Sequence, residues 1–255
     1  MPDPIFLYPV LLISGILAGL VDAIAGGGGL VSVPVLLWIG LPPQQVLGTN
    51  KFQSTFGSFT AAFNYAKSRT VLLSDCYVGI FVTFIGAVLG TWTLQKMDTN
   101  VLEKFIPILL IFIAIYTILT PDIGTKNMRP RIPMMIFYLV FGPILGFYDG
   151  FFGPGVGSFW AMAFVFFAGF NMTSATGHTK VMNFTSNIVS LCVFIYYGDV
   201  YFRIGLCMAV GQAIGARMGS GMVIRWGAKF IRPVFIAVIV ATSIKLWASF
   251  MFKNG

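Results

Sequence analysis

The sequence predicts an all-α polytopic membrane protein made of two homologous repeats of five segments each. Hydrophobic residues fill 57% of the 255 positions and charged residues only 9%, whereas a soluble domain carries about 25% charged residues. Each half of the chain contains five apolar segments, several of them close to the roughly 20 residues that span a bilayer as a helix. The same short motifs also recur, in the same order, in both halves.

In the first half, four segments are long enough to span the membrane and one is short. The long segments are expected at 5–25, 44–66, 74–95 and 102–120. The short segment, 30–40, cannot cross a hydrocarbon core of about 30 Å at a rise of about 1.5 Å per residue. Because it follows a run of glycines that ends the first helix, we expect a broken helix whose second part is a short half-helix.

The second half repeats this order. Long segments are expected at 133–152, 173–197, 201–224 and 229–251, with a short one at 156–169 after the second glycine run. Between the halves, the loop 121–133 holds three prolines and three cations. We interpret this loop as the hinge between a first transmembrane repeat, 1–125, and a second, 126–255.

Motif spacing indicates that the two halves arose by duplication. Asp149 follows Asp22 by 127 residues, and Gly153 follows Gly26 by the same interval. The stretch Gly48-Thr-Asn-Lys51 matches Gly177-His-Thr-Lys180 at a spacing of 129. Later matches keep the order: Ile85-Gly86-Ala87 and Gly90 with Ile214-Gly215-Ala216 and Gly219, then Pro107 with Pro233.

The positions of lysine and arginine predict the orientation in the membrane. Basic residues are enriched in cytoplasmic loops. If every segment reverses direction, three basic clusters fall on one side, which places both termini in the periplasm and inverts the second repeat relative to the first. Lys96 and Lys104 would then face outward, against the trend. If the two short segments re-enter without crossing, the repeats are parallel and this topology fails. The clusters are Lys67/Arg69, Lys126/Arg129/Arg131 and Arg225/Lys229/Arg232.

The glycine runs are the first candidate binding elements. Gly27, Gly28 and Gly155 lie just before the short segments, and a glycine lets the backbone approach a ligand closely because it has no Cβ. The free N–H groups at the start of each short helix favour an anion. The alternative is close helix packing, which also favours small residues in membranes.

Lys51 and Lys180 place one cation at membrane depth in each half. Each lies several residues inside its segment, roughly 10 Å along a helix that rises about 1.5 Å per residue. Ionisable residues at this depth are rare and mark binding sites or transport pathways. We interpret the two lysines as cations that face a central anion. The alternative is that they only neutralise Asp22 and Asp149.

Asp22 and Asp149 are the acidic residues that lie well inside apolar segments. Three roles remain open for them: pairing with the lysines, carrying a coupling proton, or capping the short helices. Arg217 is a further candidate for charge pairing, because it lies in the middle of the segment 201–224. It can reach a substrate or extend to the membrane interface.

Polar residues beside the lysines predict a cavity wall. In the segment 44–66, Asn50, Ser54 and Gly57 lie at i, i+4 and i+7, and in 173–197 Thr179, Asn183 and Ser186 do the same. This spacing places each set on one helix face. His178, the single histidine, can titrate during transport or donate to an anion. The alternative for His178 is an interior residue that only makes a local hydrogen bond.

No enzyme, cofactor or metal site is indicated. The sequence has no P-loop in the required context and no Ser/His/Asp arrangement, and its three cysteines show no metal-binding spacing. The net charge of +8 is attributed to basic cytoplasmic loops, so no nucleic-acid partner is expected. The expected partners are the lipid bilayer, a small anionic substrate and protons, and a homodimer is compatible with the sequence.

The motifs resemble those of the TauE/SafE family of sulfite and organosulfonate exporters, also called toluene-sulfonate uptake permeases. The resemblance rests on four stretches: Gly19-Leu-Val-Asp22 with the glycines that follow, Gly48-Thr-Asn-Lys51, Gly146-Phe-Tyr-Asp149 with Gly153-Pro-Gly155, and Thr176-Gly-His-Thr-Lys180. The stretch Gly215-Ala-Arg217-Met-Gly219 also fits. The resemblance implies a permease of the bacterial inner membrane for small sulfur-containing anions such as sulfite, thiosulfate, sulfonates or sulfoacetate-like compounds. It implies neither the particular substrate nor the direction of transport.

The leading functional hypothesis is therefore a secondary transporter of a small sulfur-containing anion that works by alternating access, with its site between the two repeats. One alternative is a cation- or proton-coupled carrier or channel that uses Asp22 and Asp149 as its primary ligands. A third hypothesis, from a different class, is a membrane assembly protein without a substrate.

Overall fold

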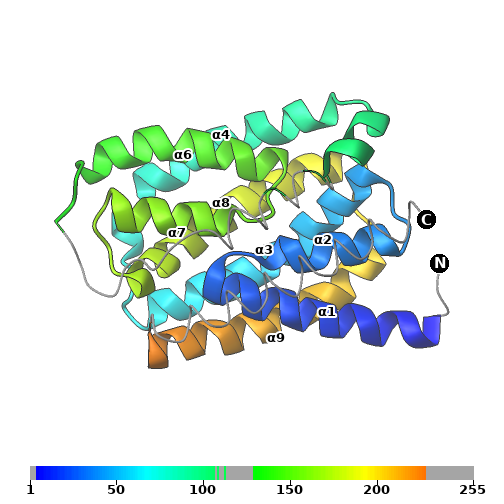
Figure 1. Cartoon of the computed structure of the whole chain (residues 1–255), viewed down its shortest axis with the longest axis horizontal. Helices are drawn as coiled ribbons and strands as arrows, with labels where there is room; N and C mark the ends of the chain where they lie inside the picture. The colour runs from blue at the N-terminus through cyan, green and yellow to red at the C-terminus, as the bar shows by residue number, and fades with distance from the viewer. Residues whose placement is uncertain (1–3, 107, 109–111, 113–128, 228–255) are drawn as a thin grey trace.

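The computed structural model describes residues 4–106, 108, 112 and 129–227, and these residues form helices joined by short loops (Figure 1). No strand occurs within these ranges. The expected segment 229–251 and most of 102–120 lie outside the described residues, although 99–106 are helical. The helices are α1 (Pro4–Ala25), α2 (Gly28–Trp38), α3 (Pro43–Lys67), η1 (Leu73–Asp75), α4 (Tyr77–Gln95), α6 (Met134–Phe151), α7 (Val156–Phe166), α8 (Met172–Tyr197) and α9 (Phe202–Trp226).

The helices have the length and surface of a membrane protein, which confirms the all-α membrane fold class. Three of them are long and apolar enough to span a bilayer: Phe6–Ala25 in α1, α4 and α6. Large apolar side chains are exposed on their outer faces, where lipid can solvate them. Examples are Phe6, Ile13, Leu17, Phe81, Leu89, Leu139 and Ile144.

Two pairs of helices pack closely through glycines. In the first pair, α1 lies beside α9 (Figure 1). Gly211, Gly215 and Gly219 of α9 face the backbone oxygens of Leu12, Ile16 and Leu20, and a Cβ at any of the three would overlap its partner. Because the partners advance by four residues on both helices, α1 and α9 run parallel. Small residues permit this approach of two backbones in a membrane.

The second pair, α4 and α6, uses the same arrangement. Gly86 and Gly90 of α4 face the backbone oxygens of Pro143 and Phe147 in α6. In the other direction, Gly146 and Gly150 of α6 meet the oxygens of Thr83 and Ala87. This pair is therefore also parallel, and each pair joins one helix from the first half of the chain with one from the second.

The more polar helices α3 and α8 contact each other in the middle of the bundle, α3 also packing against α9 and α8 also packing against α4. Their buried residues include many polar side chains, among them both lysines. The polar composition of α3 and α8 therefore belongs to the interior, in contrast to the apolar outer faces of α1, α4 and α6.

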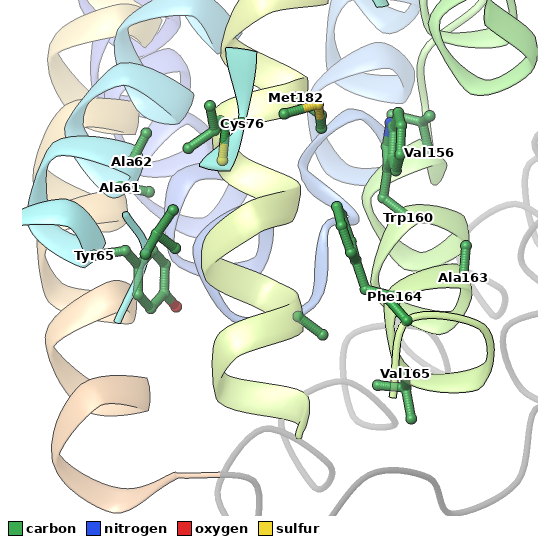
Figure 2. Packing of buried hydrophobic residues seen from close by; sticks show 14 of the residues in the cluster. Ala61, Ala62, Tyr65, Cys76, Val156, Trp160, Ala163, Phe164, Val165 and Met182 are labelled. Carbon is green, nitrogen blue, oxygen red and sulfur yellow. The ribbon is translucent and has the colours of Figure 1, made fainter. Parts of the chain in front are cut away.

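The short helices occur where the glycine runs predict them. Helix α2 has 11 residues and α7 also has 11, so each is about 16 Å long and does not span the bilayer. Trp160 and Phe164 of α7 are buried in one hydrophobic cluster with Met182 of α8 (Figure 2). This packing fixes the short helix to the bundle.

The two chain breaks that precede the short helices contact each other. Gly26, with a φ of +77°, follows α1 and touches Gly157 at the start of α7. Gly29 in the first turn of α2 packs against Pro154 in the other break. A side chain at Gly26 would be strained by its positive φ and would also overlap the backbone of Gly157. The glycine runs therefore let the two breaks meet inside the protein.

The glycine contacts between α1 and α9 predict a difference between two substitutions on one helix. In Gly215→Ala, the new Cβ overlaps the backbone oxygen of Ile16, so we expect a loss of about 1–3 kcal/mol in stability. In the control Gly221→Ala, nothing lies within 4 Å of the new Cβ, and the higher helix propensity of alanine should leave stability unchanged or slightly increased. Thermal unfolding in detergent measures both. Equal stability of the two variants would contradict the packing of this pair.

Candidate functional site

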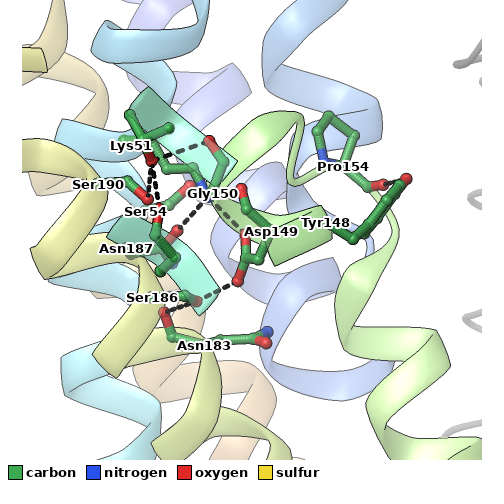
Figure 3. A network of polar contacts seen from close by, with 12 residues as sticks. Lys51, Ser54, Tyr148, Asp149, Gly150, Pro154, Asn183, Ser186, Asn187 and Ser190 are labelled. Carbon is green, nitrogen blue, oxygen red and sulfur yellow. Dashed lines mark hydrogen bonds and ion pairs between the residues drawn. The ribbon is translucent and has the colours of Figure 1, made fainter. Parts of the chain in front are cut away.

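Lys51 on α3 forms a buried ion pair with Asp149 near the end of α6. The side chains are 2% exposed each, and Lys51 Nζ lies 2.5 Å from Asp149 Oδ1. The same ammonium group donates to the backbone oxygen of Asp149 at 2.5 Å and to Asn187 Oδ1 at 3.2 Å. An ammonium group has three N–H donors, so the hydrogen-bonding capacity of Lys51 is filled (Figure 3).

The partners of Lys51 are held by further contacts across three helices. The hydroxyl of Ser186 on α8 donates to Asp149 Oδ2, the carboxylate oxygen that Lys51 does not use. Asn187 Nδ2 donates to Ser58 Oγ on α3 at 3.3 Å. Figure 3 shows Asp149, Ser186 and Asn187 converging on Lys51 between α3, α6 and α8. A buried polar network is stabilising when all its members have hydrogen-bond partners. Both carboxylate oxygens of Asp149 have such a partner, Lys51 for one and Ser186 for the other.

Lys180 on α8 forms the second ion pair, with Asp22 near the end of α1. Lys180 Nζ lies 3.0 Å from Asp22 Oδ2, and the side chain of Lys180 is fully buried while that of Asp22 is 12% exposed. The contact lacks hydrogen-bond geometry, and Lys180 Nζ has no hydrogen-bond partner among the described residues. This pair is therefore less completely satisfied than the pair of Lys51 and Asp149.

The two ion pairs cross between the halves of the chain. Each lysine contacts the aspartate of the other half, and each aspartate lies just before a glycine break. The sequence offered pairing as one role of the lysines and aspartates but did not indicate which lysine meets which aspartate. The two breaks contact each other through Gly26 and Gly157, so both pairs belong to one central region.

Two other predicted binding residues, Asn50 and Thr179, already make hydrogen bonds within the protein. Asn50 Oδ1 accepts from Ser32 Oγ of α2 at 2.6 Å and from Gln53 Nε2 at 3.1 Å. Thr179 Oγ1 donates to the backbone oxygen of Ala175 in its own helix at 2.8 Å. Both side chains thus already have partners, although both are buried next to the lysines.

Asn183 has an unsatisfied group. Its Oδ1 atom is buried without a hydrogen-bond partner among the described residues, and its Nδ2 atom would lie 3.0 Å from a Cβ built on Gly157. Asn183 is therefore directed at the first turn of α7. A buried polar atom without a partner in the protein alone is a candidate contact for a ligand or water.

The predicted glycines lie at the starts of the short helices. Gly27 is the residue before α2 and Gly155, with a φ of +83°, is the residue before α7. Gly28 packs against the side chain of Asp22, where a Cβ would lie 2.7 Å from Asp22 Cβ. Gly153 was not predicted as a site residue, yet a Cβ there would lie 3.0 Å from Lys51 Nζ. Its positive φ of +96° also favours glycine.

His178 and Arg217 make contacts that do not involve the ion pairs. His178 Nδ1 is 2.8 Å from the backbone oxygen of Ser174, and its ring packs against Phe164 and Phe170. Arg217 Nη1 donates to Asn64 Oδ1 at 2.5 Å, an exposed contact between α9 and α3. The structure brings neither residue to Lys51, Lys180 or the two aspartates.

Two contacts of the site were not among the predicted binding residues. Ser186 and Asn187 complete the surroundings of Asp149 and Lys51. Helical spacing did place Ser186 on the same polar face as Thr179 and Asn183, and Asn187 follows Ser186 directly in the sequence. Within the described ranges, no group of three or more His, Cys, Asp or Glu side chains is arranged to hold a metal.

Comparison with known proteins identifies relatives over nearly the whole chain. The sequence model of the family described as "Sulfite exporter TauE/SafE" matches residues 11–246. A "Probable membrane transporter protein" of Haemophilus influenzae is 39% identical, over 98% of this chain and 96% of that protein. The "Probable membrane transporter protein YfcA" of Escherichia coli K12 is 44% identical, over 96% of this chain and 91% of the relative. No solved structure matches the chain significantly.

The filled network around Lys51 predicts a large effect when one partner is removed. Lys51→Met leaves the buried carboxylate of Asp149 without its cation, and breaking a buried ion pair in this way costs about 3–5 kcal/mol. We expect a lower melting temperature in detergent. The double variant Lys51→Met/Asp149→Asn should recover most of the loss because it buries no unpaired charge. A single variant as stable as the unaltered protein would argue against the pair.

Proposed function

Because the chain belongs to the TauE/SafE family of membrane transporters, we propose that it is a secondary transporter of a small, sulfur-containing anion such as sulfite, thiosulfate or a sulfonate. The observation that carries the proposal is the placement of two buried lysines beside the meeting point of two helix breaks. The family description, sulfite exporter, supports the class of substrate.

The chemistry of the central region suits a small oxyanion. Lys51 and Lys180 bring positive charge, and α2 and α7 begin at the breaks. The helix dipole makes this end positive. Among the first-turn N–H groups, those of Leu30, Val156 and Ser158 already donate to backbone oxygens of the breaks, so Gly28, Gly29 and Gly157 are the first-turn residues that can offer an N–H to an anion. The carboxylates of Asp22 and Asp149 offset the charges of the two lysines. An anion can therefore bind a lysine either by displacing its carboxylate or by lying beside a carboxylate that has taken up a proton. An anion rather than a cation therefore fits the region.

We propose alternating access between two inverted repeats, 1–125 and 126–255, as the mechanism. In support, α1 and α6 hold corresponding sequence positions and run in opposite directions in Figure 1. The α1/α9 and α4/α6 pairs also use glycines at corresponding positions, and each joins one repeat to the other. Inverted repeats of this kind bind their substrate at the repeat interface and rock around it.

The proposed location is the bacterial inner membrane, with both termini in the periplasm. The C-terminal end of α3, the N-terminal end of α6 and the C-terminal end of α9 lie at the same end of the bundle in Figure 1. By sequence, Lys67, Arg131 and Arg225 belong to these ends. The positive-inside rule makes this end cytoplasmic.

A cation-coupled carrier with Asp22 and Asp149 as primary ligands is less well supported. Both carboxylates already contact a lysine, and a paired carboxylate attracts a cation weakly because the lysine cancels its charge. Proton coupling stays compatible with the site, since a proton can bind one carboxylate without displacing the lysine. No described contact favours an assembly protein without a substrate.

Transport in proteoliposomes tests the proposal. The unaltered protein should move labelled sulfite, thiosulfate or a sulfonate. Lys51→Ala/Lys180→Ala should reduce the rate at least about tenfold, since removing even one charge-assisted bond to the anion, worth about 1.5–3 kcal/mol, has that effect. Lys67→Ala, which removes an exposed cation at the end of α3, serves as the control and should transport normally. Normal transport by the double variant would exclude the two lysines from the site.

A further inference from the structure

The two ion pairs are chemically unequal although they hold corresponding places in the two halves of the chain. Lys51 Nζ has three acceptors, namely two oxygens of Asp149 and one of Asn187. Lys180 Nζ is fully buried, touches one oxygen of Asp22 at 3.0 Å, and has no hydrogen-bond partner of good geometry among the described residues. One lysine is therefore completely satisfied and the other retains unused donors.

The inequality follows from single residues at corresponding positions. The spacing of 129 that relates Lys51 to Lys180 also relates Gly57 to Ser186 and Ser58 to Asn187. Ser186 donates to Asp149 and Asn187 accepts from Lys51. Gly57 has no hydroxyl to offer Asp22, and the hydroxyl of Ser58 instead donates to the backbone oxygen of Ser54 at 2.7 Å. The partners that complete the first pair are therefore missing at the second.

The unused donors of Lys180 lie beside other groups that suit an anion. Asn183, one helical turn further along α8, is buried with an unpaired amide oxygen and is directed at Gly157 in the first turn of α7. Asp22 packs against Gly28 in the first turn of α2. Turning the Asn183 amide by 180° exchanges its oxygen for its NH₂ group, which gives an anion a further donor.

We propose that Lys180, Asn183 and the first turns of α2 and α7 form the anion subsite, that Asp22 takes up a proton when the anion binds, and that the pair of Lys51 and Asp149 remains closed as a structural link. This inference rests on the proposed function and assigns its substrate contacts unequally to the two halves. The ligand is a small sulfonate or sulfur oxyanion with oxygens that accept hydrogen bonds.

The proton follows from the charges at the subsite. An anion beside an ionised Asp22 would place two negative charges against one lysine in a buried region, where unbalanced charge is costly. A proton from solvent on the Asp22 carboxylate restores neutrality, and Lys180 keeps its own charge.

The surroundings of Asp22 contain few groups that could replace this proton. Lys180 faces it from α8, and the hydroxyl of Tyr65 on α3 donates to the adjacent Ala23 oxygen at 2.9 Å. Helices α2 and α7 contain no titratable residue. On α9, Arg217 is directed to Asn64. None of these neighbouring groups supplies a further positive charge to the subsite. The carboxylate of Asp22 therefore has to accept the proton that balances an incoming anion.

Thermal unfolding of the purified full-length protein in detergent distinguishes the two halves. The probes are methanesulfonate and thiosulfate, which stay ionised between weakly acidic and neutral pH, and chloride is the control anion. A ligand that binds the folded state raises the melting temperature with its concentration. We expect this rise in the unaltered protein and in Lys51→Met/Asp149→Asn, and its complete loss in Lys180→Met/Asp22→Asn. Both double variants remove one buried ion pair and leave no unpaired charge, so they are matched.

A milder variant covers the case in which Lys51→Met/Asp149→Asn does not fold. Ser186→Ala removes only the hydroxyl that donates to Asp149 Oδ2. It should lower the melting temperature without ligand and keep the full anion-dependent rise. Loss of the rise in Ser186→Ala would overturn the assignment of this half as a structural link.

Proton uptake tests the role of Asp22. Addition of methanesulfonate to the protein in weak buffer should raise the pH by the equivalent of about one proton for each anion bound. Asp22→Asn should bind the anion without proton uptake, because its amide is already neutral. Binding to the unaltered protein without proton uptake would overturn this part of the proposal.

The outcomes separate this inference from the proposed function. If both double variants lose the anion-dependent rise, or only the Lys51 variant does, the unequal assignment is wrong while a transporter of anions remains. If the unaltered protein transports the anions in vesicles but shows no rise with any of them, the assignment also fails. If there is neither transport nor a rise, the proposed function fails first, and the subsite falls with it.

Discussion

The two ion pairs that join one half of the chain to the other are the constraint on which the rest of the structure depends. Lys51 and Lys180 are buried in the centre of the bundle, where an unpaired charge costs several kcal/mol. Each needs a carboxylate, and each finds it on the other half, in Asp149 or Asp22. The aspartates precede the chain breaks, so the pairs also hold α1 and α6 against α8 and α3.

The glycines allow the helices to come close enough for these ion pairs to form. At Gly26 and Gly157 the two breaks touch backbone to backbone, and along α9 and α4 glycines face the oxygens of α1 and α6. A side chain at these points would push the helices apart and draw the aspartates away from the lysines. In a membrane, close packing takes the place of the hydrophobic effect between helices. The small residues and the charges thus act together: the first permit the approach and the second specify the partners.

Sequence reasoning predicted the fold class and the helix order well because both depend on local patterns. The expected segments at 44–66 and 133–152 correspond to α3 (Pro43–Lys67) and α6 (Met134–Phe151), since apolar length and prolines act within a few residues. The short helices followed from the glycine runs for the same reason. The family resemblance was confirmed by the comparisons, which match the chain from residue 11 to residue 246.

The contacts of the site depend on distances that sequence does not contain. His178 was grouped with Lys180 because the two are close in sequence, but in α8 its ring lies among Phe164 and Phe170, away from the ion pair. Neighbours two residues apart point to different sides of a helix. Arg217 reached Asn64 rather than a central charge. Ser186 and Asn187 gained their roles only through the approach of α3 and α6.

The sequence by itself determined that this is a helical membrane protein of the TauE/SafE family, that its helices break at two glycine runs, and that Lys51, Lys180, Asp22 and Asp149 lie inside membrane segments. Composition, periodicity and motif spacing are sufficient for these properties because each is local or repeated along the chain. Only the tertiary structure decided that the ion pairs cross between the halves and that one is filled while the other is open. These properties arise where helices far apart in sequence meet, and there a single hydroxyl, present at Ser186 and absent at Gly57, changes which donors remain free.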